Sequence, residues 1–137
     1  MDPSFLNLPW HASYAEAKRL LENQGKTLKD PVMHDSTVRA QLDGELEFGC
    51  CTASHAALDF VYYPDGSDPK EKNELIDALC YFDASIPFDQ VRLAVRSVFG
   101  LDNGMHNDFT SVWNDGMVTF KLEKKDRFTV LTVIYGD

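Results

Sequence analysis

A helical pattern that occurs twice constrains the fold of this chain more than any other feature. The segments SYAEAKRLLENQG (13–25) and SIPFDQVRLAVRSVFG (85–100) both place apolar side chains at helical spacing. Three positions of one segment correspond to three of the other: Tyr14 to Phe88, Ala17 to Val91 and Leu21 to Val95. In a chain of 137 residues, this repeat predicts two similar units, each built on one amphipathic helix.

The ends of both helices carry ordinary start and stop signals. Ser13 and Glu16 form a capping box, and Gly25 ends the first helix. The second helix begins after Ser85, with a proline that the first turn tolerates, and it ends at a glycine. We expect Val98 to lie on its apolar face with the three positions named above.

Extended segments follow each helix. Alternation and turn dipeptides predict strands within STVRAQLDG (36–44), ELEFGCCTA (45–53), HAALDFVYY (55–63), DFTSVWND (108–115), MVTFKLEKK (117–125) and RFTVLTVIYG (127–136). Asp43-Gly44 predicts a tight turn between the first two of these segments. Residues 69–83 fit a helix or a strand, and the aromatic side chains near their end favour a strand from about Glu74.

Together these elements predict an α+β fold. We expect two tandem α-β-β-β modules, with the helices packed on one face of a mostly antiparallel sheet. The chain is long enough for one domain with a core of its own, so we expect a single domain over 1–137. Its pseudo-repeat halves span about 5–83 and 84–137.

The segments FLNLPWHASYAEAKRLLENQG and SVWNDGMVTFKLEKKDRFTVLTVIYGD carry a family resemblance. Their helix-plus-sheet module resembles that of SmpA-like envelope lipoproteins, which act in β-barrel assembly. The tandem duplication is similar to the fold of the β-lactamase inhibitory protein. The resemblance implies a protein-binding module without catalytic residues, whose exposed sheet and loops grip a partner.

Charge excludes one class of partner and favours another. The chain has 22 acidic and 13 basic residues, a formal net charge of −9. Proteins that bind DNA or RNA directly need the opposite balance, whereas a basic protein is the natural complement. No apolar run is long enough to span a bilayer, so we expect no membrane span. The first residues, MDPSFLNLPWHAS, lack a signal-peptide pattern, which predicts a cytoplasmic protein, or an exported one if a leader was removed.

The sequence shows no established catalytic or metal-binding motif. Cys50, Cys51 and Cys80 fit free thiols better than disulfides, with the adjacent pair pointing to opposite faces of a strand. Cys51 and His55 lack the four convergent ligands that zinc takes, so we expect no metal and no cofactor. Cys50 or Cys51 with His55, or with His106 and an aspartate, leaves an uncharacterised Cys/His hydrolase as an alternative.

Acidic side chains gather in two turn-rich stretches, LDGELE (42–47) and PDGSDPKEKNE (64–74). We expect these stretches to bind the partner through Asp43, Glu45, Glu47, Asp65, Asp68 and Glu71. Tyr62 or Trp113 would serve as an exposed aromatic anchor, although tryptophan in such strands also packs in cores.

These observations predict a protein that binds another protein and catalyses nothing. The most specific hypothesis is an acidic inhibitor of the immunity type that neutralises a basic toxin or nuclease. An envelope assembly or scaffold domain, with its leader removed, is the alternative within the same class.

Overall fold

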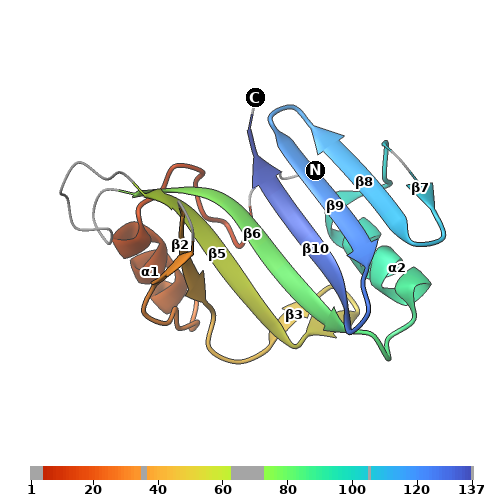
Figure 1. The fold of residues 1–137 in the computed structure, drawn as a ribbon, viewed down its shortest axis with the longest axis horizontal. Helices are drawn as coiled ribbons and strands as arrows, with labels where there is room; N and C mark the ends of the chain where they lie inside the picture. Colours follow the sequence, from red (N-terminus) through yellow and green to blue (C-terminus); the bar gives the residue numbers. More distant parts are fainter. Residues whose placement is uncertain (1–4, 35–36, 63–72, 105, 137) are drawn as a thin grey trace.

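The computed structural model describes residues 5–34, 37–62, 73–104 and 106–136, with the side chains of His34, Tyr62, Asn73 and His106 excepted. Its helices and strands are α1 (Tyr14–Asn23), β1 (Val32–His34), β2 (Thr37–Gln41), β3 (Leu46–Phe48), β4 (Cys51–Ala53), β5 (His55–Tyr62), β6 (Asn73–Asp83), α2 (Phe88–Phe99), β7 (His106–Asn107), β8 (Thr110–Asp115), β9 (Val118–Lys124) and β10 (Phe128–Tyr135). Eight strands form one sheet in the order β1-β2-β5-β6-β10-β9-β8-β7 (Figure 1). β3 and β4 form a separate two-stranded sheet.

This architecture confirms the predicted fold class in its coarse form. The described chain combines two helices with strand pairs that are all antiparallel. The preference for a strand within 69–83 is also confirmed, because β6 begins at Asn73 and pairs with β5 and β10. That the two halves are equivalent modules stays a prediction.

Helix α1 forms where its capping signal places it. The backbone N–H of Glu16 donates to Oγ of Ser13 over 3.1 Å, which satisfies one of the free N–H groups of the first turn. Tyr14, Ala17 and Leu21 are buried, as their spacing predicts. The ring of Tyr14 packs edge-on against that of Phe60 in β5, with 6.0 Å between ring centroids.

Helix α2 begins after Pro87 and ends at Gly100, close to the predicted limits. Its buried residues include Phe88, Val91 and Val95. The expectation for Val98 is wrong, because this side chain is 46% exposed and Phe99 is buried in its place. The ring of Phe99 lies 4.0 Å from that of Phe120 in β9, so the last turn of the helix contacts the core through the aromatic residue.

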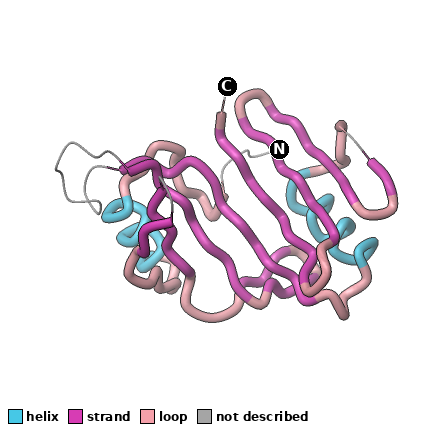
Figure 2. Tube along the Cα trace, viewed as in Figure 1, coloured by secondary structure: helices cyan, strands magenta, loops and turns pink. Residues whose placement is uncertain are grey.

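The large sheet has one buried face and one partly open face. Leu131 of β10 lies opposite Leu122 of β9 and Cys80 of β6, and all three are fully buried. The neighbours of Leu131 along the strand, Val130 and Thr132, point the other way and are partly exposed. Most buried apolar side chains belong to a single core. The helices lie near opposite ends of the sheet (Figure 2).

The predicted pairing of residues 36–53 is wrong. Asp43-Gly44 does not join two paired strands, because β2 pairs with β1 and β5 instead. Residues 45–53 do not form one strand either, since the chain reverses at Gly49 and Cys50 so that β3 pairs with β4. Local turn signals cannot reveal which strand is the partner, because sheet pairing is a long-range choice.

Candidate functional site

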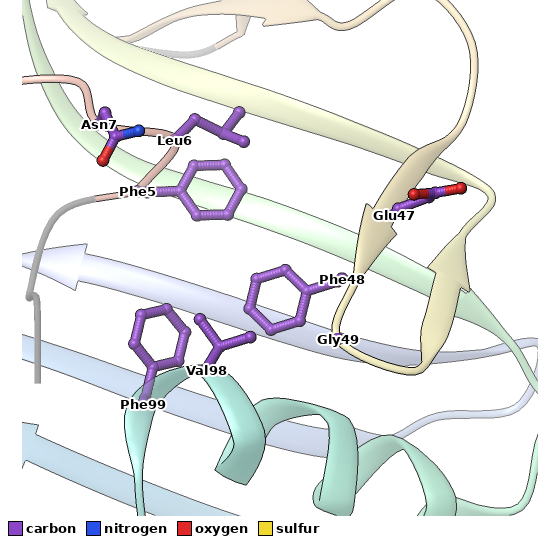
Figure 3. Close-up of a pocket in the computed structure, with 8 residues that line it drawn as sticks. All are labelled: Phe5, Leu6, Asn7, Glu47, Phe48, Gly49, Val98 and Phe99. Carbon is purple, nitrogen blue, oxygen red and sulfur yellow. The ribbon is translucent and has the colours of Figure 1, made fainter.

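A shallow apolar hollow of about 250 Å³ lies where three segments meet. Figure 3 shows the side chains that line it: Phe5, Leu6 and Asn7 from the N-terminal segment, Glu47, Phe48 and Gly49 from the β3–β4 hairpin, and Val98 and Phe99 from the end of α2. We call it the aromatic hollow, because the rings of Phe5, Phe48 and Phe99 form its walls.

The walls are fixed by contacts deeper in the core. The ring of Phe48 lies 5.7 Å from that of Phe99 and 6.2 Å from that of Phe82 in β6. Phe5, Phe48 and Phe99 are each at most 7% exposed. The rings that wall the hollow are therefore part of the buried core, and the apolar side chains exposed at its edge are Leu6, in part, and Val98.

Gly49 lets the hairpin approach α2. Its backbone has φ +60°, and a Cβ atom there would lie 2.7 Å from the carbonyl oxygen of Ala94 and 2.7 Å from Oγ of Ser97. Real Cβ atoms do not come this close, so only glycine fits without movement of the hairpin or the helix.

The opposite lip of the hollow is a strained turn. Leu6 and Asn7 have φ +55° and +58°, in the left-handed region that glycine and asparagine tolerate and leucine rarely adopts. The turn is closed by a hydrogen bond from the N–H of Leu8 to the carbonyl of Phe5, and Nε2 of Gln24 donates to the carbonyl of Leu6 over 2.9 Å. The structure holds a leucine side chain at the lip at the expense of backbone strain.

The first predicted acidic stretch adjoins this hollow. Asp43, Glu45 and Glu47 are all exposed, and Glu47 lines the hollow itself. Asp43 has Lys29 as a distant partner at 4.0 Å. Within the part of the chain that the structure describes, Glu45 and Glu47 have no ion-pair partner. One carboxylate without an ion-pair partner among the described residues, that of Glu47, therefore lies at the hollow.

No family model, curated protein or solved structure matches the chain. The resemblance to SmpA-like lipoproteins and to the β-lactamase inhibitory protein therefore stays an expectation. The site has to be interpreted from its own geometry.

Most of the second predicted acidic stretch lies outside the part of the chain that the structure describes. Asp65, Asp68 and Glu71 lie outside the described residues, as does the side chain of Tyr62. The description of the chain stops at Tyr62, the last residue of β5, and resumes at Asn73, the first residue of β6.

Trp113 is not an exposed anchor. It is fully buried, and its indole N–H donates to the carbonyl of Gly100 over 2.7 Å. The alternative interpretation, core packing, is the correct one.

The cysteines are free, and the environment of Cys51 opposes catalysis. Cys51 is buried, its thiol contacts the carbonyl of Gln90 at 3.6 Å, and burial together with neighbouring Cys50 raises its pKa. A nucleophilic cysteine needs a lowered pKa and access to substrate. His55 instead stacks on Tyr81, with ring centroids 4.3 Å apart. No group of three or more potential ligands is placed to hold a metal ion among the described residues.

A second charged cluster, which sequence reasoning missed, lies on the partly open face of the sheet. Arg39 of β2 donates to both oxygens of Asp59 in β5 over 2.7 and 2.9 Å. Asp59 in turn lies opposite Asp77 of β6. Burial, followed by the interaction with Asp59, raises the pKa of Asp77 to about 8. One guanidinium group therefore faces two carboxyl groups. Because side chains alternate between the two faces of a strand, the sequence could have indicated that these three residues point away from the apolar face of their strands.

Of the described helices, neither is long and apolar enough to cross a membrane.

Proposed function

We propose that this protein is a non-enzymatic protein-binding module that engages a basic partner through the acidic stretch 43–47 and the aromatic hollow beside it. The most specific form of the proposal is an inhibitor of the immunity type, which neutralises a basic toxin or nuclease. Within the proposal, the halves 5–83 and 84–137 are tandem α-β-β-β modules whose helices cover one face of the sheet. The pairing of β6 with β10, which end the two halves, supports this organisation.

One observation carries the proposal: Glu45 and Glu47 are exposed and lack ion-pair partners among the described residues, and Glu47 lines the apolar hollow. Protein interfaces combine an apolar centre with a polar rim. The net charge of −9 gives the whole molecule a field that attracts a basic partner and speeds its encounter. A hollow walled by phenylalanine offers few side chains that could act in catalysis. Such a hollow suits the binding of an anchor side chain of a partner protein.

The test begins with capture of the partner from the native host on the immobilised full chain. The purified partner is then titrated against a triple variant, Asp43→Lys, Glu45→Lys and Glu47→Lys, at several salt concentrations. We expect its affinity to fall by at least about 100-fold, since like charges across an interface are strongly unfavourable. The dependence of affinity on salt should become weaker or reverse.

A matched variant controls for the overall change of charge. Glu22, Asp108 and Asp126 are exposed acidic residues outside the proposed surface, and their replacement by lysine changes the net charge by the same amount. We expect this variant to bind only a few-fold more weakly. If both triple variants bind the partner equally, the acidic stretch 43–47 is not the interface.

A further inference from the structure

The aromatic hollow has room for one long side chain and not for a typical small-molecule ligand. Its volume of about 250 Å³ is below the roughly 300–1,000 Å³ of most ligand pockets. Its lining includes Val98 near the end of α2, which is 46% exposed. The hollow is thus about as large as the pockets in which protein interfaces bury one anchor residue of the partner.

The turn at the lip of the hollow holds Leu6 and Asn7 at positive φ. Glycine at position 6 would adopt φ +55° without strain, whereas the side chain of leucine disfavours this region. The hydrogen bond from Gln24 holds the Leu6 carbonyl in place. Backbone strain that the surrounding structure enforces is common at sites that clamp a ligand.

The charge at the rim selects the occupant. Among the described residues that line the hollow, Glu47 alone carries a charge. Figure 3 shows it at the rim across from Leu6 and Asn7, with its carboxylate directed away from the phenylalanine rings. An apolar floor with one carboxylate at the edge suits a side chain that has an aliphatic stem and a cationic end, because such chains bury the stem and keep the charge in water.

Resting on the proposed function, we infer that the aromatic hollow receives a lysine or arginine side chain of the basic partner. The stem lies against Leu6, Val98 and Phe99, and the cationic group meets Glu47 at the rim. The partner therefore anchors itself through one basic residue at the centre of its contact surface.

Small probes test this assignment on the full chain without the partner. The probes are hexylammonium, 1-hexanol and heptanoate, which share an alkyl chain and differ in charge. Binding is followed by NMR of the methyl groups of Leu6 and Val98. We expect saturable shifts at millimolar hexylammonium, with hexanol about two- to five-fold weaker, the range of an exposed ion pair, and heptanoate weaker still.

Two variants sharpen the test. Glu47→Gln should weaken hexylammonium to the level of hexanol and leave hexanol unchanged, whereas Glu22→Gln on α1 should change neither. Equal binding of the three probes, or an unchanged ratio in Glu47→Gln, would overturn the assignment. Methyl shifts that depend on protein concentration alone would also overturn it, because they would place a second copy of the chain in the hollow.

The outcomes separate this inference from the proposed function. If the charge-reversal variant loses the partner but the probes do not discriminate, the acidic surface stands and the lysine or arginine anchor is wrong. If hexylammonium binds as expected but charge reversal leaves the partner's affinity unchanged, the hollow binds cations and the proposed interface is wrong.

Discussion

Replacement of Gly49 by alanine perturbs the contact between the β3–β4 turn and helix α2. The new Cβ would lie 2.7 Å from the carbonyl oxygen of Ala94, which belongs to the helix backbone and cannot rotate away. It would also lie 2.7 Å from Oγ of Ser97, which hydrogen-bonds to that same carbonyl. The hairpin or the helix must therefore move, and the floor of the aromatic hollow moves with it.

Gly116 offers a matched control for the magnitude. Its φ of +64° is close to the +60° of Gly49, but a Cβ there would meet nothing within 4 Å. In both alanine variants, positive φ destabilises the folded state by about 1 kcal/mol. In both, alanine also lowers the conformational entropy of the unfolded chain, which partly offsets this strain. Only Gly49→Ala adds overpacking, which typically costs about 1–3 kcal/mol. We expect its free energy of unfolding to lie that much below that of Gly116→Ala.

Urea denaturation, followed by the fluorescence of the two tryptophans, measures both free energies of unfolding. Adding Ser97→Ala removes one of the two close atoms, so a double-mutant cycle should show a smaller penalty for Gly49→Ala in that background. The Ala94 contact remains, so the penalty should not vanish. Equal stabilities of the two glycine variants would refute the close approach of hairpin and helix.

Two further predictions follow from the titratable groups. Folded Asp77 holds its proton up to about pH 8, while the unfolded chain releases it near the ordinary value of 3.8. The free energy of unfolding should therefore fall as pH rises between these two values. Urea titrations at several pH values should show a smaller fall for Asp77→Asn than for the unsubstituted protein. Parallel pH profiles of the two proteins would contradict this role of Asp77. In the native protein, a thiol reagent should modify exposed Cys50 rapidly and buried Cys51 and Cys80 only after unfolding, as mass spectrometry of the labelled protein would show. Rapid native labelling of Cys80 would contradict its complete burial.

Local signals in the sequence predicted the elements that depend on local interactions. The cap at Ser13 involves groups three residues apart, and it lies where the pattern places it. Strand pairing was less predictable. The chain forms its hairpin turn at Gly49, although the sequence signal for a turn is stronger at Asp43-Gly44. The hairpin at Gly49 is stabilised by contacts with α2 and β6, which the sequence does not reveal.

The candidate site was predictable only in its charge. Runs of acidic residues near a turn indicated that Asp43, Glu45 and Glu47 would be exposed. The apolar half was not predictable, because helical spacing assigns Val98 to the core and nothing in the sequence reveals a left-handed Leu6. Whether one side chain of an apolar stripe is covered depends on which distant segment packs beside it.

The central place of β10 has a consequence for synthesis of the chain. β10 is the last described strand, yet it lies between β6 and β9 and joins the two parts of the sheet. Until Phe128–Tyr135 has left the ribosome, β6 and β9 each present an unpaired edge beside apolar side chains that the finished protein buries. Unpaired edges readily recruit strands of other chains. The growing chain is therefore more prone to aggregate than the completed one, and a ribosome stalled before residue 128 holds its most vulnerable form.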